Sequence, residues 1–557
     1  MTRRNTRHPQ WLISIYCLFI LTLASCTTPT ETQETTSKVA EYGSRPNILW
    51  LVAEDMSPYL EYYGDSTIHT PNLHRIASEG IIYTNVYSTA GVCAPSRSTI
   101  ATGMYQTSMG THHMRTTGSP DYLPEGVVPY SAVIPPEVKM HSEYLRRAGY
   151  YVTNNSKEDY QFKAPVTAWD ESSNTAHWRN RPEGKPFFAI FNFNICHESG
   201  MWLNAEHQLT VDPDSVPVWP YYPDTPLVRE EIARMYSNIL EMDQQVGEVL
   251  DQLEADGLMD STIIVFYADH GGPLPRQKRE IYDTGLKVPM FIRYPDKRRA
   301  GEYEDELVSF VDFTPTLLSM AGVAPPTHLQ GRAFAGKYED PSPRQYIYAA
   351  RDRLDSEYDM VRGVRDERFK YFKNYQPEKP YVMAIKYREQ MRLMRALHEY
   401  DSMGQLNEQQ SLWFRDSKPE EELYDLENDP YELNNLADDP AYQDKLAELR
   451  QKLLAWQEKY GDKGFVPETE MLREMWPGLE QPITEKPLIS SSGGALQITC
   501  PTQGASIAYQ LKDADGNELF PSWQVYTEPI QVQEGQSLSA ISERIGYAPS
   551  EEITYQP

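Results

Sequence analysis

The stretch CAPSR at residues 93–97 combines a nucleophile with an anion-binding group. Pro95 suits the first turn of a helix, because a residue there needs no backbone N–H. We therefore expect a helix that ends near Gly103, with Cys93 just ahead of its N-terminus. That end of a helix attracts anions, and Arg97 adds a forked donor suited to sulfate or phosphate oxygens. A small buried cysteine beside a structural arginine is the plainer alternative, but the whole pentapeptide favours an anion site with a modifiable side chain.

Two acid-bearing pairs follow apolar runs and could bind a metal. Glu54 and Asp55 follow NILWLVA, and Asp269 and His270 follow TIIVFYA. In doubly wound α/β folds, ligands lie beyond the carboxyl ends of the strands. Buried acids that converge must be neutralised, and carboxylate oxygens favour Ca²⁺ or Mg²⁺. Each pair alone would suit a solvated strand-to-loop transition, but the two together predict a metal site.

The chain that must position these groups alternates strands and helices, which predicts an α/β fold with helices on both faces of a sheet. Continuous apolar runs are typical of strands buried on both sides. Strands are expected at 47–53, 186–193, 262–267 and 288–292, and helices at 230–253 and 305–321.

The pattern changes after about residue 340. We expect β-like runs over 345–375, charged helix over 376–415, an amphipathic helix through Trp456, connecting chain over 457–485, and then the short strands ALQITC, SIAYQL, IQVQ and SLSAIS. These changes divide the chain into a catalytic domain at 46–340, a subdomain at 341–480 and a small all-β module at 486–557.

The N-terminal residues predict export. A basic start precedes an apolar run too short for a confident membrane span, and LASC resembles a bacterial lipoprotein cleavage box. We expect a signal peptide over 1–26, a lipid on Cys26 that attaches the protein to a membrane, and a flexible tether over 27–45. The protein would then lie in the periplasm or on the bacterial cell surface. An ordinary signal peptide and an uncleaved anchor are the alternatives.

Composition limits the partners. The net charge of −28 argues against a nucleic-acid partner. Beyond the signal and Cys26, the cysteines are Cys93, Cys196 and Cys500, so at least one is unpaired. An unpaired thiol is unusual in an oxidising compartment, and this singles out the cysteines for attention.

These motifs match a family. CAPSR and its continuation STIATGMY resemble the C-x-P-S-R signature of type I sulfatases, in which a maturation enzyme oxidises the cysteine to formylglycine. LYDLENDPYELNNLA is similar to the family's C-terminal subdomain, and the resemblance covers roughly residues 46–460. The loops look closest to the heparan N-sulfatase-like branch of bacterial polysaccharide sulfatases. The resemblance implies an alkaline-phosphatase-like fold with a mixed central sheet, and a sulfated carbohydrate as substrate.

The resemblance also implies roles for single residues. The hydrated aldehyde at Cys93 would attack sulfur, and Arg97 would hold the hydrate. Lys278 and Lys157 would contact the sulfate, and His197 would protonate the leaving sugar oxygen.

The metal ligands implied by the resemblance are Glu54, Asp55, Asp269 and His270, and the ion would be one Ca²⁺, or Mg²⁺. Two of them depart from the usual pattern. Glu54 stands where aspartate is commoner. His270 offers a nitrogen, which is not the donor that Ca²⁺ prefers.

The second family signature, G-K-x-H, departs further. Here Ser156 replaces the glycine, and Asp159 stands where a histidine is a candidate base. Asp159 or His113 of GTHHMR would take over that role. The missing histidine also motivates an alternative, a non-catalytic glycan-binding protein, against which the intact CAPSR counts.

The acidic composition bears on the substrate. A negative surface repels a long polyanion unless salt screens it, and acidic surfaces are common in marine proteins. We therefore expect a seaweed polysaccharide such as ulvan or carrageenan, or its oligosaccharides, with glycosaminoglycans as the rival. A phosphoesterase or phosphonate hydrolase is a further alternative, because the same fold serves phosphoryl transfer. The β-module resembles the small C-terminal domain of bacterial hexosaminidases, and its aromatic residues could stack on a sugar or simply pack.

Overall fold

The computed structural model describes residues 45–556. The predicted signal peptide, Cys26 and nearly all of the tether lie outside the described residues. Within 45–556, no helix combines the length and the apolar character that crossing a bilayer requires.

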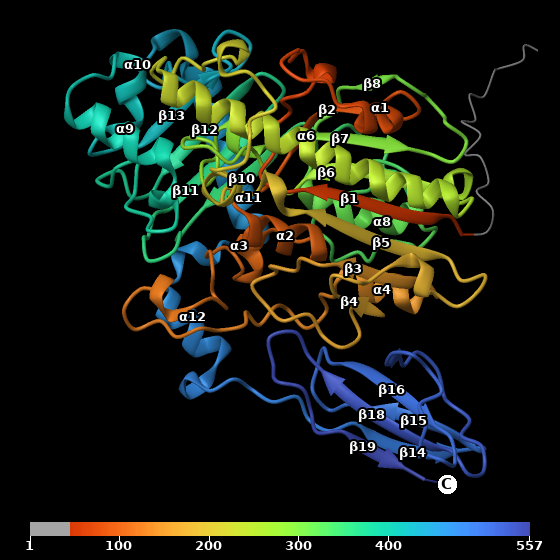
Figure 1. Ribbon diagram of the computed structural model, residues 1–557. Helices are drawn as coiled ribbons and strands as arrows, with labels where there is room; N and C mark the ends of the chain where they lie inside the picture. Colours follow the sequence, from red (N-terminus) through yellow and green to blue (C-terminus); the bar gives the residue numbers. More distant parts are fainter. Residues whose placement is uncertain (1–44, 557) are drawn as a thin grey trace, which may run out of the picture. The chain divides into compact units, whose positions relative to one another are not determined.

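A mixed nine-stranded sheet forms the centre of the described chain (Figure 1). Its strands pair in the order β4-β3-β5-β1-β6-β7-β2-β8, with β9 beside β2. Strand β1 pairs in parallel with both β5 and β6, and the apolar run of β1 is buried on both faces. The predicted strands are confirmed, and so is the mixed sheet. The strands are β1 (Asn47–Ala53), β2 (Ile81–Tyr87), β3 (Tyr151–Asn155), β4 (Glu171–Ser172), β5 (Phe187–Phe193), β6 (Thr262–Ala268), β7 (Lys287–Arg293), β8 (Tyr303–Glu304) and β9 (Val308–Ser309).

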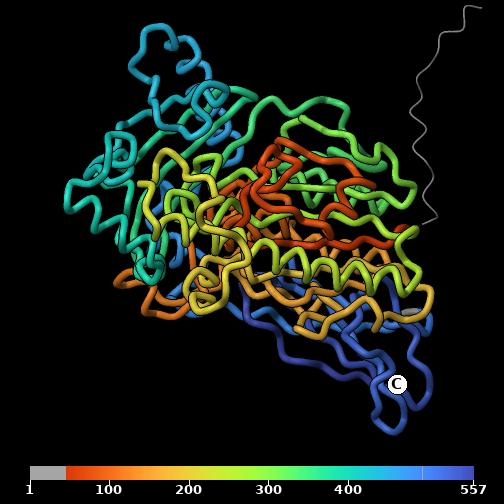
Figure 2. Tube along the Cα trace, turned by 45° about the horizontal axis from the view of Figure 1, so that its top comes forward, coloured from red at the N-terminus to blue at the C-terminus, as the bar shows by residue number. Residues whose placement is uncertain are grey.

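Helices cover both faces of this sheet. Helices α1 (Pro71–Ala77) and α6 (Pro226–Ala255) pack together on one face. Helices α2 (Cys93–Thr102), α4 (His141–Arg147) and α8 (Phe313–Met320) pack together on the other. The trace in Figure 2 follows the same segments from a second direction. The layers place the loops after β1, β5 and β6 at one edge of the sheet.

A second, antiparallel sheet follows, in the order β10-β11-β12-β13. Helix α11 packs on β11 and β12. The elements of this region are β10 (Ile347–Arg351), β11 (Val361–Arg365), β12 (Phe369–Asn374), α9 (Arg392–Ser402), α10 (Glu408–Ser411), β13 (Glu421–Asp425), α11 (Gln443–Tyr460) and α12 (Glu468–Met475).

The C-terminal β-module contains a two-stranded and a four-stranded sheet. Hydrogen bonds join it to the first region, among them Ser506 Oγ to Glu143 Oε1 at 2.6 Å and Val166 N to Glu543 Oε2 at 2.8 Å. Its strands are β14 (Leu488–Ser492), β15 (Ala495–Thr499), β16 (Ser506–Lys512), β17 (Gln524–Val525), β18 (Ser537–Glu543) and β19 (Ile553–Tyr555). The predicted strand IQVQ forms only an isolated bridge, between Leu496 and Ile530.

Besides the strand IQVQ, the charged helix expected over 376–415 forms only α9, α10 and short turns. Two more predicted elements differ from the structure. The helix expected at 305–321 is shortened to α8, because Val308 pairs with Val86 of β2 and extends the sheet. The connecting chain expected at 457–485 contains α12, whose Met471 and Leu472 pack against an apolar loop that includes Tyr130. In both cases contacts with distant parts of the chain decided the secondary structure, and a local sequence pattern does not reveal such contacts.

Candidate active site

The carboxyl ends of three parallel strands meet at one place. Ala53 at the end of β1 lies level with Phe193 of β5 and Ala268 of β6. The residues that follow therefore converge, and the backbone N–H of Asp55 donates to Asp269 Oδ1 at 3.1 Å. Glu54, Asp55, Asp269 and His270 are all buried at this edge, where the sequence predicted a metal site.

Cys93 is the first residue of α2 and is 1% exposed. The helix ends at Gly103, which has the left-handed backbone typical of a C-cap, as expected from the sequence. The Cys93 Sγ atom lies 3.3 Å from His270 Nε2, 3.4 Å from Lys278 Nζ and 3.8 Å from Asp55 Oδ1. Among the described residues Cys93, Cys196 and Cys500 are all free thiols.

The residues present fit a divalent cation. Asp55, Cys93, Asp269 and His270 each offer a ligand atom, and these atoms lie within 4.8 Å of one another. Two of the four are carboxylates, the donors preferred by hard cations. Glu54, which the resemblance also places on the metal, is held instead by Lys157 and by Arg97 Nη2 at 3.4 Å. Its role as a ligand stays a prediction.

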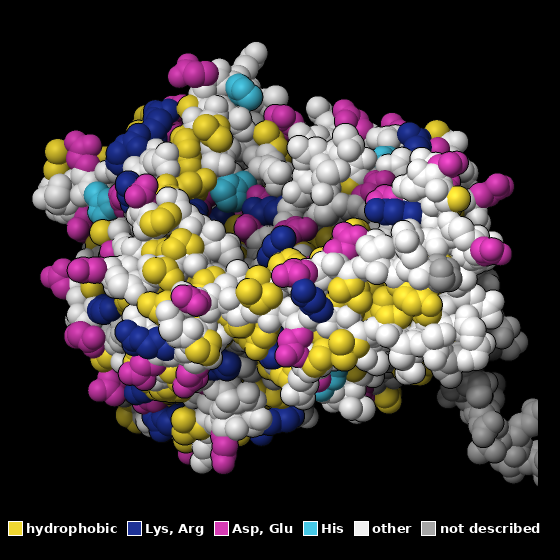
Figure 3. All heavy atoms as spheres, turned by 90° about the horizontal axis from the view of Figure 1, so that it is seen from below, with side chains coloured by type: hydrophobic (Ala, Val, Ile, Leu, Met, Phe, Trp, Pro, Cys, Tyr) yellow, Lys and Arg dark blue, Asp and Glu magenta, His cyan; other side chains and the backbone are white. Residues whose placement is uncertain are grey.

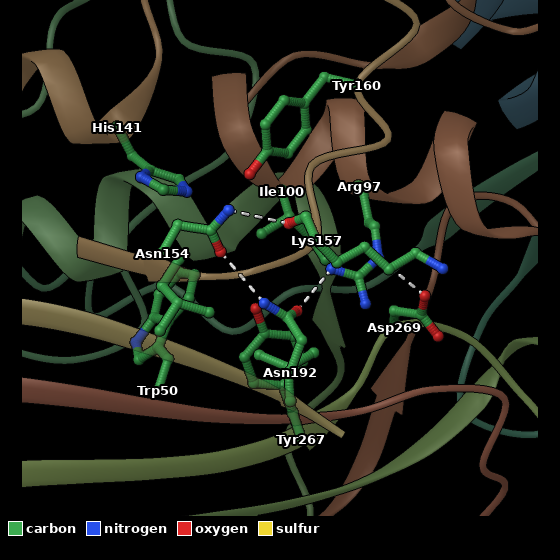
Figure 4. A pocket seen from close by; sticks show the side chains of 12 residues that line it. Trp50, Arg97, Ile100, His141, Asn154, Lys157, Tyr160, Asn192, Tyr267 and Asp269 are labelled. Atoms are coloured by element: carbon green, nitrogen blue, oxygen red, sulfur yellow. Dashed lines mark hydrogen bonds and ion pairs between the residues drawn. The ribbon is translucent and has the colours of Figure 1, made fainter. Parts of the chain in front are cut away.

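Besides Glu54, two polar groups hold Arg97. Its Nε donates to Asp269 Oδ2 at 2.9 Å, and its Nη1 donates to Asn192 Oδ1 at 2.8 Å. Asn192 in turn donates to Asn154 Oδ1 at 3.1 Å, and Figure 4 shows this chain of side chains beside Lys157. The sequence analysis missed both asparagines. For Asn192 the signal was a polar residue near the end of the otherwise apolar strand β5.

Figure 4 also shows residues that line a small cavity, among them Arg97 and Lys157. Its volume of about 20 Å³ has room for about one water molecule and none for a sugar. A ligand larger than water therefore reaches Cys93 from another side. Of the side chains gathered around Cys93, His197 and Lys157 are those that keep partial exposure, so the opening lies next to them.

Lys278 joins the acids to Cys93. Its Nζ lies 2.5 Å from Asp55 Oδ2 and 3.5 Å from Glu198 Oε1. Glu198 is fully buried, makes a two-bond pair with Arg279, and donates its N–H to Asp55 Oδ2 at 2.7 Å. The sequence analysis missed Glu198 and Arg279, although each stands next to a predicted site residue.

The proximity of these charges shifts pKa values. Burial alone would raise the pKa of Asp55, but Lys278 and His270 outweigh it and hold the pKa well below its usual range. Burial alone would lower the pKa of His270, but the carboxylates of Asp269 and Asp55 raise it to about 10. Lys278 has a raised pKa because Asp55 outweighs the effect of burial. Without an ion, the acids are thus balanced by protein cations.

His197 stands at the exposed side of this cluster. It follows the short helix Asn194–Cys196 after β5, and its Nδ1 lies 2.8 Å from Ser199 Oγ. Burial, together with the charge of Lys278, lowers the pKa of His197 to about 3. The imidazole is therefore neutral near pH 7 in the free protein.

The two candidates for the missing base lie in different surroundings. Asp159 is beside Lys157, with 3.4 Å between Oδ2 and Nζ. His113 is buried against His112, and its Nε2 lies 3.9 Å from Glu468 Oε2. Within residues 45–556, no hydrogen bond or ion pair joins His113 to Cys93. Its placement favours packing, and the catalytic role of either residue stays a prediction.

The fold and this edge define a class of protein. A mixed sheet covered by helices, with acids at its carboxyl edge facing a helix N-terminus, is an alkaline-phosphatase-like architecture. Comparison with solved structures agrees: the chain is similar to a protein in complex with its substrate D-glucosamine-2-N,6-O-disulfate, with a TM-score of 0.53, 20% identity, and coverage of 76% of this chain and 99% of that one. It is also similar to a phosphonate monoester hydrolase of Agrobacterium radiobacter, with a TM-score of 0.52, 17% identity, and coverage of 75% and 97%. At these identities the likeness concerns the fold alone.

Sequence comparison gives the family. Residues 46–323 match the sulfatase family, and residues 276–411 match the C-terminal domain of N-sulphoglucosamine sulphohydrolase. An ulvan-active sulfatase of Formosa agariphila is 49% identical over 546 residues, 91% of this chain and 91% of that protein. The chain therefore belongs to the sulfatase family and is a sulfuric ester hydrolase, as the CAPSR motif indicated.

Proposed function

We propose that this sulfatase hydrolyses sulfate esters of ulvan or of oligosaccharides derived from it. The observation that carries the substrate is the near full-length similarity to an ulvan-active sulfatase. The net charge of −28 opposes binding of a long polyanion at low salt. Figure 3 shows acidic side chains spread over one face with Lys and Arg among them, so screening by salt would weaken this repulsion over that whole face.

The proposal includes a formylglycine at residue 93 and a bound cation. A maturation enzyme would convert Cys93 to formylglycine, which supplies one hydroxyl to attack sulfur and a second to expel sulfate. Asp55 and Asp269, with His270 and Glu54, would hold Ca²⁺, whose positive charge would stabilise the sulfate oxygens.

The protein cations match the charge of the substrate. Lys278 lies between Asp55 and Cys93, and Lys157 pairs with Glu54. When these acids hold a divalent ion, both ammonium groups are free to bind sulfate at residue 93. Arg97 stays anchored by Asn192 and orients the oxygens of the hydrate.

His197 would deliver the proton to the leaving sugar oxygen. Its low pKa in the free protein arises from burial and from Lys278. A bound sulfate offsets the charge of the lysines, which raises the pKa of His197 and permits protonation. The S–O bond to the sugar then breaks as the sugar oxygen takes the proton from the imidazole.

The N-terminal sequence supports a location outside the cytoplasm. A lipid on Cys26 would attach the enzyme to a membrane in the periplasm or at the cell surface. At that location the enzyme would meet fragments of an external polysaccharide.

The test is sulfate release from ulvan, carrageenan and heparan oligosaccharides and from the long polymers, at low and high salt. The protein is co-expressed with a formylglycine-generating enzyme, and mass spectrometry verifies the aldehyde at residue 93. Release from ulvan that Cys93→Ala abolishes is the expected result. An enzyme that carries the aldehyde and does not act on ulvan contradicts the proposal.

A glycosaminoglycan sulfatase is the second candidate. The match to the C-terminal domain of N-sulphoglucosamine sulphohydrolase favours it. Release from heparan oligosaccharides that exceeds release from ulvan would establish it.

A further inference from the structure

A group of aromatic and basic side chains borders the opening beside His197. The Tyr387 ring lies 6.3 Å from the His197 ring, and the Trp202 ring meets Tyr387 edge-on at 5.2 Å. The guanidinium of Arg115 lies 4.2 Å from the centre of the Tyr387 ring and 4.9 Å from that of Tyr122. We call Arg115, Tyr122, Trp202 and Tyr387 the rim cluster.

The rim cluster comes from three distant parts of the chain. Arg115 and Tyr122 follow α3 (Gln106–Met109), Trp202 belongs to α5 (Gly200–Leu203), and Tyr387 precedes α9. All four side chains are half-buried, whereas Cys93 is 1% exposed. The cluster therefore lies where the buried site meets solvent.

The positions that the proposed reaction requires for sulfur and for the sugar oxygen bring the sugar to the rim cluster. Sulfur must lie at residue 93, and the sugar oxygen must lie at His197. The sugar ring then extends away from Cys93 on the far side of His197, where Tyr387 and Trp202 stand. Aromatic side chains of this kind suit the apolar face of a sugar ring.

An ion pair holds the Arg115 side chain but takes up only part of its hydrogen-bonding capacity. Its Nη1 donates to Asp355 Oδ1 at 2.8 Å, and among the described residues its Nε and Nη2 have no hydrogen-bond partner. The other oxygen of Asp355 is buried without a partner, so this pair is not the two-bond fork that both groups could make. Arg115 and Asp355 both have positive φ, 59° and 50°. Such conformations are rare outside glycine and gather at functional sites.

We propose that Arg115 is a specificity-determining residue that binds an acidic group of the sugar chain, with Tyr387 and Trp202 against the sugar ring. The inference rests on the proposed function and deepens it. The acidic group is a planar or tetrahedral oxyanion, either the carboxylate of a uronic acid or a second sulfate. Arg115 offers two free N–H directions to that group, while the tyrosine rings hold the guanidinium plane.

The test uses Arg115→Met and three substrates. They are a sulfated oligosaccharide that contains uronic acid, the same oligosaccharide after chemical reduction of its carboxyl groups, and 4-nitrophenyl sulfate. Loss of a charge-assisted contact should lower kcat/KM on the native oligosaccharide about 10- to 100-fold, mainly through KM. Turnover of 4-nitrophenyl sulfate should stay within about 2-fold of the wild type, because it has no second acidic group to lose.

The reduced oligosaccharide separates the two sources of the acid. If Arg115 binds a carboxylate, reducing the substrate should lower kcat/KM of the wild type as much as the substitution lowers it on the native oligosaccharide. Reduction should then cause no further fall in kcat/KM of the variant. If Arg115 binds a second sulfate, the substitution should lower kcat/KM equally on both oligosaccharides. An equal loss on all three substrates, or no loss on any, overturns the proposal.

Two further variants guard against an effect on folding. Arg115→Lys keeps the charge and the contact with Asp355 but lacks the fork, and should lose about 3- to 10-fold on the acidic sugar alone. Arg544→Gln, in the C-terminal module, removes an arginine that lies 4.6 Å from one tyrosine ring and should leave all three rates unchanged. A wild type that cleaves 4-nitrophenyl sulfate but no oligosaccharide contradicts the proposed function itself, and this inference fails with it.

Discussion

Two buried groups of charges in this protein are built differently. The first, which we call the catalytic cluster because catalysis is proposed for it, contains Asp55, Asp269, Arg97, Lys278 and Cys93. The α12 cluster contains Glu468 with Arg353, Tyr130 and Tyr358. Glu468 and Arg353 are both fully buried, as are the acids of the catalytic cluster.

The α12 cluster is complete in itself. Arg353 donates to Glu468 at 2.6 and 2.8 Å, and the hydroxyls of Tyr130 and Tyr358 donate at 3.0 and 2.7 Å. One acid is thus matched by one cation and two hydroxyls. Such a group joins distant segments of the chain and has no need of a ligand.

The catalytic cluster is arranged for partners. Asp55 and Asp269 face each other across His270, with ion-pair distances of 3.0 and 3.8 Å. Lys278 and Lys157 form ion pairs with Asp55 and Glu54, two of the residues predicted to bind the metal. Acids that adjoin acids mark a site for a cation, whereas an acid saturated by donors marks a structural pair.

Cys93→Ala gives the largest contrast between the clusters. We expect sulfate release to fall by at least about 10⁴-fold, roughly 5.5 kcal/mol in the activation barrier, because the nucleophile is lost. Thermal unfolding should change little. Ion chromatography measures the sulfate, and Cys196→Ala, another buried free thiol, serves as the matched control. Activity within about tenfold of the wild type would rule out residue 93 as the nucleophile.

Removal of metal should act on the catalytic cluster alone. Dialysis against a chelator should lower activity about 10³-fold, roughly 4 kcal/mol, because the cation no longer stabilises the transition state. Ca²⁺ should restore activity, and a parallel addition of Mg²⁺ compares the two ions. The metal content is checked by mass spectrometry. Full activity in a demonstrably metal-free sample would exclude the metal site.

Glu468→Gln should act on stability alone. Removing the charge that pairs with buried Arg353 should cost roughly 3–5 kcal/mol in the free energy of unfolding. Activity per folded molecule should remain the same. Urea unfolding gives the free energy, and Glu470→Gln, on the exposed side of the same helix, is the control. A stable but inactive variant would place the α12 cluster, and His113 beside it, in the catalytic machinery.

Glu231→Gln tests a buried acid that belongs to neither cluster. Burial raises the pKa of Glu231 to about 7, although Arg392 lies 3.6 Å away. The folded protein then binds this proton more tightly than the unfolded chain, so the free energy of unfolding falls as pH rises from about 4.5 to 7.

The Gln variant should therefore be more stable than the wild type by about 2 kcal/mol at pH 8 and nearly equal to it at pH 5. Chemical unfolding at several pH values measures this, with half-exposed Glu230→Gln as control. A difference that does not depend on pH would show that Glu231 does not titrate in this range.

The contrast also explains what the sequence could predict. The acids predicted to bind a metal directly follow apolar strands, so the rule that parallel strands end at a common edge predicts that they meet. CAPSR predicted a helix that starts just after Cys93, and α2 begins at Cys93 itself. Glu468 and Arg353 are 115 residues apart, and no local pattern joins them. For the same reason the sequence placed connecting chain where α12 lies.

What the sequence determined by itself is the chemistry at the ends of strands and at the start of one helix, because period, capping and strand polarity are local properties. The tertiary structure decided which charged and polar groups lie next to one another. It placed Glu54 with Lys157 and Arg97, buried His113 away from Cys93, and brought Arg115, Trp202 and Tyr387 to the opening beside His197. These outcomes depend on packing between segments far apart in the chain, and only the folded molecule brings those segments together.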